Sequence, residues 1–405
     1  MLSANNTDNG REFVTMRKKI ALVNQRYGLE VNGGSELYCR QLAEKLKEIY
    51  DVEVITTCAL DYTTWANYYP EGVSEINGIT VRRFKTEAVR EQKSFDKLSA
   101  KVFSFDHTDA EEEEWIKAQG PYSPGAVEYI RAHSGDYHAV IFVTYLYYLT
   151  ATCLYDGSIK NAIHLPTAHD EPPVYLRHYK SVFENPKGII YLTPEEKEFC
   201  DSKFYVSHLP SVITGAGVDV PSDEALFDAK ARYGLDEYII YAGRIDESKG
   251  CGTLFKYFAE YKKRVGGDVK LVLIGKSVMD IPKRDDIIPL GFVTDEEKFS
   301  LIRDARLLVL ASEFESLSMV VLESMVYERP VLVNGRCMVL KGHCTRSNAG
   351  LYFENYFEFE GALKYLLTHD SEREEMGKNG RIYVNENYRW DVIVERISGL
   401  IEGIN

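Results

Sequence analysis

The chain has 405 residues, of which 45% are apolar and 27% charged, and this composition is typical of a folded protein large enough for two or three domains. A formal net charge of −14 argues against a general nucleic-acid binder, which needs a basic face against the phosphates. The seven cysteines include no CxxC pair, so neither a zinc ribbon nor a thioredoxin-like centre is expected, and free thiols in a reducing compartment are the simplest interpretation.

Residues 1–17 are polar and are interpreted as a flexible N-terminal tail that lacks the apolar segment of a signal peptide. No stretch approaches the roughly 20 apolar residues needed to span a bilayer. These features predict a cytoplasmic protein and leave peripheral contact with the inner membrane face open. The acidic residues between 106 and 114 are interpreted as a solvent-facing surface.

The first half of the chain alternates short apolar runs with helical patterns. Residues 19–24 predict a buried parallel strand, a glycine-bearing loop follows, and residues 35–50 have helical spacing before a second strand at 52–57. This order is the βαβ unit of an open α/β sheet. A hairpin is expected at 76–84, and further buried strands are expected at 139–144, 161–166 and 188–192.

The same pattern restarts after a linker predicted at 221–230. Strands are expected at 238–242, 269–274, 287–290, 307–310 and 330–333. Two sets of βα units predict an α/β fold with two Rossmann-like domains facing each other across a cleft, at 18–220 and 221–385. The last segment, 386–405, is helical and has no strand after it. Ligands of such sheets bind at the carboxyl ends of strands, so polar motifs at those positions carry weight.

The first such motif is Gly33-Gly34-Ser35-Glu36, at the first strand-to-helix junction. Two glycines allow close backbone approach to a ligand, and a helix N-terminus attracts anions. The alternative is an ordinary helix start with Ser35 as N-cap. The G-x-G-x-x-G fingerprint is missing and no acidic residue ends the second strand, so a nicotinamide oxidoreductase is a distant alternative.

The second motif runs from Gly243 to Gly250 and contains two cations, Arg244 and Lys249. It follows the strand at 238–242. An Arg fork and a Lys point charge suit a diphosphate leaving group, whose negative charge needs neutralisation as the glycosidic bond breaks. The alternative interpretation is a surface Arg–Asp pair.

The third motif lies between 312 and 323 and contains Glu315 and Glu323, eight residues apart. If a helix begins near Ser318, Glu315 stands at its mouth, Glu323 lies more than a turn inside, and the amides at Ser318 and Met319 face a donor phosphate. Both carboxylates are then candidates for binding sugar hydroxyls. A capping or ion-pair role within the helix is the alternative for Glu323.

The fourth motif, His169-Asp170, follows the strand expected at 161–166. His169 is a candidate to donate a hydrogen bond to a sugar or to stabilise developing positive charge through its backbone carbonyl. A lone histidine is more often structural, so this interpretation rests on its position.

Together the motifs resemble glycosyltransferase family 4, which has the GT-B fold, over residues 18–395. The resemblance implies retention of anomeric configuration, no metal in the site, and a last helix that crosses back onto the N-terminal domain. It also implies a donor site in which Arg244 and Lys249 bind the diphosphate, Glu315 lies near the donor sugar and Glu323 binds the ribose. The resemblance further implies that His169 takes part in catalysis and that Gly33 and Gly34 form the glycine loop of this site.

Two features depart from or extend that resemblance. Ser316 and Ser318 stand where many relatives have glycines, which affects the fine positioning of the loop. Residues 333–346 resemble a bacterial subgroup with an N-[GA]-R-C stretch, and four of their polar residues are candidates for the donor side of the cleft: Asn334, Arg336, Lys341 and Arg346. The alternative is a strand and loop that only complete the domain.

The resemblance thus implies a retaining, metal-independent transferase, and no cofactor is expected. The transferase moves a hexose-type sugar from a UDP- or GDP-linked donor to a saccharide, glycolipid or glycoprotein acceptor, with Asp170 and Glu36 on the acceptor side. The alternatives are a sugar-nucleotide epimerase and a non-catalytic sugar-binding or partner-stabilising subunit of the same fold. No nucleic-acid partner is expected, and the oligomeric state is left open.

Overall fold

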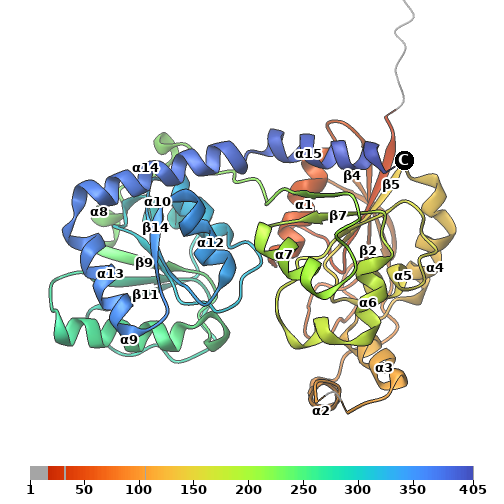
Figure 1. Cartoon of the computed structure of the whole chain (residues 1–405), viewed down its shortest axis with the longest axis horizontal. Helices are drawn as coiled ribbons and strands as arrows, with labels where there is room; N and C mark the ends of the chain where they lie inside the picture. Colours follow the sequence, from red (N-terminus) through yellow and green to blue (C-terminus); the bar gives the residue numbers. More distant parts are fainter. Residues whose placement is uncertain (1–16, 32, 105, 405) are drawn as a thin grey trace, which may run out of the picture.

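The computed structural model describes residues 17–404 except 32 and 105, so nearly all of the expected N-terminal tail lies outside the described residues. The described chain forms two separate sheets with helices packed around them, which confirms the predicted α/β fold (Figure 1). The first sheet has the order β3-β4-β2-β1-β5-β6-β7-β8 and the second β11-β10-β9-β12-β13-β14.

The first sheet is parallel except for the hairpin at its edge, where β3 pairs antiparallel with β4. Its central strands are buried along almost their whole length, because helices cover both faces. Its strands are β1 (Lys19–Val23), β2 (Asp51–Thr57), β3 (Gly72–Ile76), β4 (Ile79–Phe84), β5 (Ala139–Val143), β6 (Ala162–Leu165), β7 (Gly188–Tyr191) and β8 (Ser211–Ile213). The strands and the hairpin expected from the sequence therefore form, with bounds shifted by a few residues.

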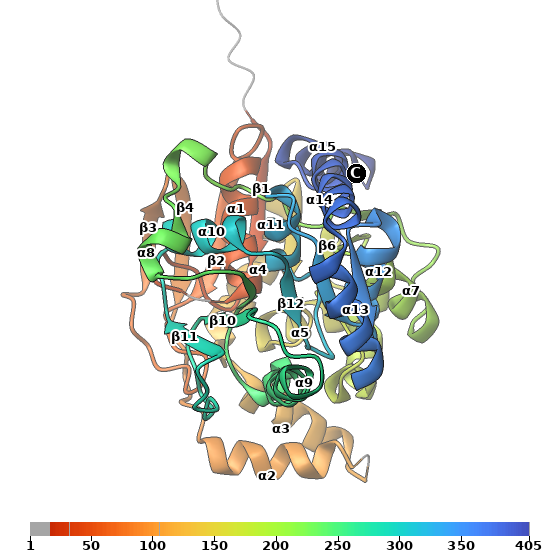
Figure 2. The ribbon, with the colours of Figure 1, turned by 90° about the vertical axis from the view of Figure 1, so that its left-hand side faces the viewer.

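The helices of the first half connect these strands, and two of them, α2 and α3, project below the rest of the molecule (Figure 2). They are α1 (Gly34–Leu46), α2 (Gln92–Val102), α3 (Asp109–Gln119), α4 (Pro124–His133), α5 (Tyr148–Tyr155), α6 (Arg177–Glu184) and α7 (Pro194–Lys203), with 3-10 turns η1 (Ser134–Asp136) and η2 (Pro172–Tyr175). The interpretation of the acidic run as wholly solvent-facing is wrong for Glu112. This residue is buried and accepts hydrogen bonds from the His178 amide and the His107 ring.

The second sheet is parallel throughout. It contains β9 (Tyr238–Ala242), β10 (Lys270–Ile274), β11 (Ile287–Gly291), β12 (Leu308–Leu310), β13 (Val331–Asn334) and β14 (Gly350–Phe353). Around it lie η3 (Asp223–Ala225), α8 (Ala229–Tyr233), η4 (Glu247–Lys249), α9 (Cys251–Arg264), α10 (Asp295–Asp304), α11 (Met319–Val326), α12 (Met338–Ser347) and α13 (Tyr356–Thr368). The interpretation of 333–346 as a strand and loop is wrong, because its second part is helix α12.

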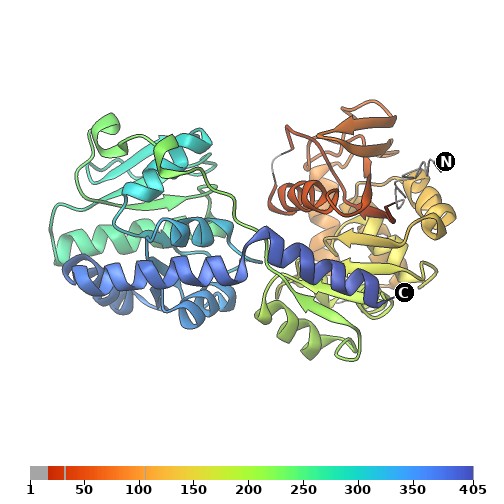
Figure 3. The same ribbon diagram turned by 90° about the horizontal axis from the view of Figure 1, so that it is seen from above.

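Helices α14 (Asp370–Asn387) and α15 (Trp390–Gly403) run along one side of the molecule, from the second sheet to the first (Figure 3). α15 packs against α1 and β8. There the Trp390 ring stacks on Tyr38 with centroids 6.2 Å apart. The domain boundaries expected at 220 and 385 stay a prediction.

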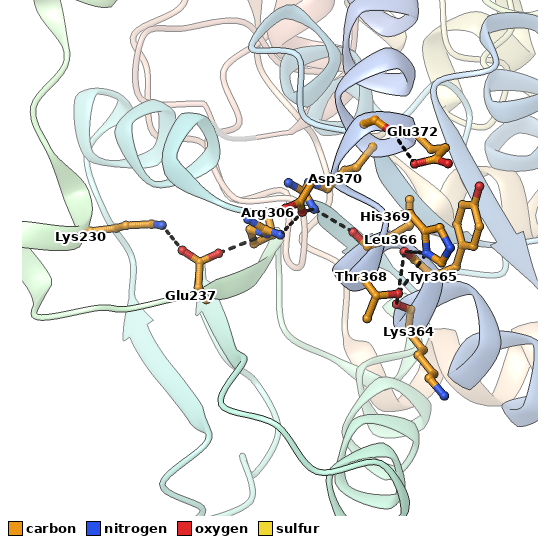
Figure 4. A network of polar contacts seen from close by, with 12 residues as sticks. Lys230, Glu237, Arg306, Lys364, Tyr365, Leu366, Thr368, His369, Asp370 and Glu372 are labelled. Atoms are coloured by element: carbon orange, nitrogen blue, oxygen red, sulfur yellow. Dashed lines mark hydrogen bonds and ion pairs between the residues drawn. The ribbon is translucent and has the colours of Figure 1, made fainter.

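A network of charged side chains ties together the elements at the amino ends of the second sheet's strands (Figure 4). Glu237, just before β9, accepts from Lys230 at 2.6 Å and lies 3.1 Å from Arg306, just before β12. Arg306 in turn donates to Asp370 at 2.6 Å, at the start of α14. Because this network lies at the opposite edge from the strand carboxyl ends, it holds helices in place without entering the cleft.

No helix within the described ranges is both long and apolar enough to cross a membrane.

Candidate functional site

A cavity of about 410 Å³ lies in the cleft between the two sheets. One wall comes from the loop after β6 and the other from the loops after β9 and β12. The lining residues are His169, Asp170, Glu171 and Pro172 on one side, and Arg244, Ser248, Lys249, Phe314, Glu315 and Ser316 on the other. The structure thus brings four of the predicted catalytic side chains, His169, Arg244, Lys249 and Glu315, to the carboxyl ends of strands of both sheets, where α/β folds bind ligands.

Asp246 organises the cation-bearing loop after β9. Its carboxylate accepts from the Lys249 amide at 2.8 Å and from the Ser248 hydroxyl at 2.7 Å, and it also pairs with the Arg244 guanidinium. Burial alone would raise the pKa of Asp246, but these hydrogen bonds and the guanidinium lower it below its ordinary value. The Arg–Asp pair considered from the sequence is therefore formed, and it presets a loop whose two cations line the cavity. Asp246 is part of the second sequence motif, but sequence reasoning did not assign it this organising role.

Gly250 ends this loop in a left-handed conformation, with φ of +69°. A Cβ at this position would lie 2.1 Å from the Ala311 carbonyl oxygen, so only glycine allows the loop to lie directly against the end of β12. That contact brings the Lys249 ammonium within 2.8 Å of the Glu315 carboxylate. The two motifs, 66 residues apart, therefore meet through an ion pair.

The loop after β12 leads into α11, which begins at Met319 and confirms the helix start expected near Ser318. Ser318 is the N-cap residue, in a left-handed conformation with φ of +65°, and its side chain makes no capping bond. Within the described residues the cavity lining includes Glu315 but not Glu323. Glu323 instead accepts from Lys298 of α10 at 3.0 Å, so its ion pair joins two helices and does not lie within one helix as the alternative expected.

A buried carboxyl group on α7 holds the loop that carries His169. Glu196, on α7, accepts from the Ala168 amide and from the Leu192 amide, both at 2.6 Å. The His169 ring lies 3.5 Å from the Glu171 carboxylate, and Asp170 accepts from the Tyr175 hydroxyl at 2.5 Å. Sequence reasoning missed Glu196 because it lies 27 residues beyond His169 on an otherwise ordinary helix.

Phe314 bridges the two walls of the cleft. Its ring centroid lies 6.2 Å from that of His169, although the two residues belong to different sheets. The side chain is 52% exposed and lines three neighbouring cavities, which indicates a surface available to a ligand. The sequence signal was an aromatic residue between two glutamates in a strand-to-helix loop.

The glycine loop has a different structure from the one expected. The N-cap of α1 is Gly33, with extended backbone, and not Ser35. A Cβ at Gly33 would meet the Glu36 carboxylate at 2.2 Å, whereas a Cβ at Gly34 would meet no atom of the described residues within 4 Å. Glu36 is buried and paired with Arg26 at 2.9 Å, and this group lies at the carboxyl end of β1.

The four polar residues predicted in the segment after β13 do not all lie at the donor side of the cleft. Asn334 and Arg336 line a cavity of about 350 Å³ that adjoins Ser248 and Phe314, beside the predicted donor site. Lys341 instead donates to Glu354 at 3.0 Å, and Arg346 pairs across the cleft with Glu195 of α7. No group of three or more His, Cys, Asp or Glu side chains is placed to hold a metal ion in the part of the chain that the structure describes.

Comparison with known proteins gives a class of protein that agrees with this geometry. Residues 222–383 match the family model described as glycosyl transferases group 1. Alpha-D-kanosaminyltransferase of Streptomyces kanamyceticus is 28% identical over 202 residues, which span 46% of this chain and 51% of that protein. The chain thus aligns with about half the length of this relative. An uncharacterised glycosyltransferase of Methanocaldococcus jannaschii is 24% identical over 421 aligned positions, covering 93% of this chain and 96% of that protein.

Solved structures share the whole architecture. Sucrose-phosphate synthase from Thermosynechococcus elongatus superposes with a TM-score of 0.69 at 18% identity and covers 96% of this chain and 99% of its own. An Anabaena protein, HepE, in complex with UDP-glucose superposes with a TM-score of 0.68 at 12% identity, over 96% and 100% of the two chains. These likenesses establish the GT-B fold, and the sequence matches support a glycosyltransferase.

Proposed function

We propose that the chain is a retaining glycosyltransferase that moves a hexose-type sugar from a nucleoside-diphosphate donor to a saccharide, glycolipid or glycoprotein acceptor. One observation carries the proposal: Arg244, Lys249 and Glu315 from the second sheet and His169 from the first line a single cavity. This places two cations, a carboxylate and an imidazole around a space large enough for a sugar diphosphate.

The two cations act on the leaving group. Negative charge grows on the donor diphosphate as the glycosidic bond breaks, and Arg244 and Lys249 stabilise it from a loop that Asp246 has already fixed. Lys249 is paired with Glu315, so the diphosphate competes with that carboxylate for the ammonium. Binding of donor then frees Glu315 to accept hydrogen bonds from the donor sugar.

The acceptor enters from the first sheet. His169 stands next to the transferred sugar, and closure of the cleft excludes water and brings the acceptor hydroxyl to the anomeric carbon. A front-face route fits retention: the leaving phosphate helps to remove the proton of the acceptor hydroxyl. Asp170 is assigned to the acceptor side. Glu36 is assigned there through the α1 start, where it fixes the glycine loop by its pair with Arg26.

The donor base is proposed as uracil or guanine. The solved neighbour with UDP-glucose supports the first choice by fold alone. Glu323, at the end of the E-x7-E pair, is assigned to the donor ribose, and the amides at Ser318 and Met319 to its phosphate. Catalysis without a metal or other cofactor, and action in the cytoplasm with acceptors that include lipids at the inner membrane face, complete the proposal.

Turnover with defined donors tests it. UDP- and GDP-hexoses are supplied with a panel of sugar and lipid-linked acceptors in the presence of EDTA, and the anomeric configuration of the product is read by NMR. Product with the donor's own configuration supports the proposal. Inverted product contradicts retention, dependence on added divalent metal contradicts the metal-free site, and isomerised donor without acceptor identifies an epimerase. Binding without turnover across the panel would favour a non-catalytic subunit.

A further inference from the structure

His343 is a completely buried histidine that contacts the donor-site loop from behind. It lies on α12, and its Nε2 is 2.8 Å from the Leu317 carbonyl oxygen, two residues after Glu315. Its Nδ1 is 3.2 Å from the Tyr383 hydroxyl on α14. The histidine therefore joins the loop between β12 and α11 to the long helix that runs toward the first sheet.

The chemistry of the partners fixes the direction of each hydrogen bond. A carbonyl oxygen can only accept, so Nε2 carries the proton and Nδ1 is the acceptor of a neutral ring. Tyr383 must then donate its hydroxyl proton to Nδ1, and it accepts from Arg346 at 3.3 Å and from the Tyr388 hydroxyl at 3.0 Å. Burial lowers the pKa of His343 to about 4, which agrees with a neutral ring.

The series of hydrogen bonds through His343 and Tyr383 begins at Tyr388, where the polypeptide crosses from one sheet to the other. Tyr388 lies between α14 and α15, and its backbone carbonyl accepts from the Val218 amide at 3.1 Å, in the segment that also crosses. A Cβ at Gly215 would lie 2.3 Å from the Tyr388 ring, so the two crossing segments are packed directly against each other. A change in how the two crossing segments pack against each other therefore displaces the Tyr388 side chain.

The other end of the chain reaches a strained peptide. Ser318 holds a left-handed backbone conformation, which is strained for a residue other than glycine, so the surrounding contacts must hold it in place. His343 fixes the carbonyl immediately before Ser318. Arg346, one turn further along α12, pairs with Glu195, whose neighbour Glu196 supports the His169 loop.

We propose that His343 is a positioning residue of the donor site: through Tyr383 and Tyr388 it couples the Glu315 loop to the crossing between the two sheets. The inference rests on the proposed function for its catalytic consequence. Its structural consequence, an ordered 315–318 loop, can be measured without turnover.

The test uses His343→Leu, which removes both hydrogen bonds, and His343→Gln, whose amide can still donate to Leu317. Tyr383→Phe and Tyr388→Phe remove single hydroxyls from the same chain. His164→Leu is the matched control, because His164 is also fully buried but neither of its ring nitrogens has a hydrogen-bond partner among the residues that the structure describes. Amide hydrogen exchange of residues 315–320 is measured for every variant, and kcat and donor KM are measured where turnover is found.

We expect exchange in 315–320 to accelerate at least tenfold in His343→Leu and to stay unchanged in His164→Leu, with His343→Gln close to wild type. We expect kcat to fall at least tenfold in His343→Leu while donor KM changes less than threefold. If His343→Leu does not fold, Tyr383→Phe must show the same changes with smaller magnitude: faster exchange in 315–320 and a lower kcat. Equal exchange in the His343 and His164 variants overturns the proposal. Altered exchange in a protein without any transferase activity supports the coupling and overturns only the proposed function.

Discussion

The Lys249 ammonium lies 2.8 Å from the Glu315 carboxylate and joins the loop after β9 to the loop after β12. The pair lines the cleft, with the Lys249 side chain 32% exposed, so a ligand can reach it. A partly exposed ion pair contributes little to stability. Its place in the cavity that His169 also lines therefore favours the proposed role in donor binding.

Replacing Lys249 by alanine should lower turnover by about 2–4 kcal/mol of transition-state stabilisation, because the growing charge on the diphosphate loses one preorganised cation. Steady-state kcat/KM with the preferred donor checks this. Lys230→Ala is the matched control: its side chain is 35% exposed and also ion-paired, but it lies at the amino ends of the strands. Equal losses of kcat/KM in both variants would contradict the assignment of Lys249 to the donor site.

Glu315→Gln should lower turnover more than it lowers the affinity for free nucleoside diphosphate. The amide keeps the size of the side chain but loses the charge that faces the donor sugar, while the diphosphate contacts of Lys249 and Arg244 remain. Isothermal titration with UDP and GDP, set beside kcat/KM, separates the two effects. Loss of nucleotide binding in this variant would contradict the division of roles between the two glutamates.

Glu323→Gln should weaken nucleotide binding if the carboxylate binds the ribose. The alternative follows from the structure, in which Glu323 accepts from Lys298 at 3.0 Å. Lys298→Met breaks the same ion pair and leaves the carboxylate in place. A rise in the nucleotide Kd in Glu323→Gln alone supports ribose binding, and unchanged Kd values with lowered stability in both variants show a purely structural pair.

Gly250→Ala should destabilise the fold strongly. Its φ of +69° costs an alanine about 1–2 kcal/mol, and the new Cβ would also lie 2.1 Å from the Ala311 carbonyl oxygen. Gly234 has a similar φ of +61° but no atom within 4 Å of a Cβ, so Gly234→Ala isolates the backbone term. Urea unfolding should give a clearly larger loss for Gly250→Ala, and equal losses would contradict the close contact.

The stability contributed by two buried histidines should fall between pH 7 and pH 5, because both stay neutral in the folded state, whereas Glu196, whose pKa burial raises to about 8, changes stability in the opposite direction. Burial lowers the pKa of His164 to about 3 and that of His343 to about 4, both below the ordinary value of 6.5. The unfolded chain therefore takes up protons that the folded chain does not, and stability present above pH 6.5 is lost as the pH falls. The loss is on the order of 2 kcal/mol per histidine by pH 5.

Removing one of these histidines isolates its share. In His164→Leu the free energy of unfolding should depend less steeply on pH in this range, as measured by urea titrations at each pH. A slope identical to that of wild type would show that burial does not lower the pKa of His164 in the folded protein.

The fold could be predicted because its central strands are continuous apolar runs that alternate with helical patterns. The edge strands β8 and β14 were missed, because most of their residues are only partly buried and lack such a run. Helix α12 was missed because Gly342 and His343 interrupt its apolar pattern. Ser35 was considered as the α1 N-cap because of its type, but the extended backbone of Gly33 begins the helix earlier.

The candidate site could be predicted motif by motif but not as a set of contacts. Arg244, Lys249, Glu315 and His169 each follow a strand, and parallel strands deliver their loops to one edge. The roles of Phe314, Glu196 and His343 depend on partners in other elements, and no local pattern reveals such partners. Glu323 is ion-paired with Lys298 on another helix, and spacing alone does not reveal such a partner.

A thermal-shift panel of free nucleotides and nucleotide sugars, run on the wild type, Lys249→Ala and Lys230→Ala, tests the central claim most directly. A ligand that binds only the folded state raises the melting temperature. The account predicts stabilisation by uridine or guanosine diphosphate compounds in the wild type and Lys230→Ala, and its loss in Lys249→Ala. No shift with any of these compounds, or the same shift in all three proteins, would contradict a donor site at Lys249.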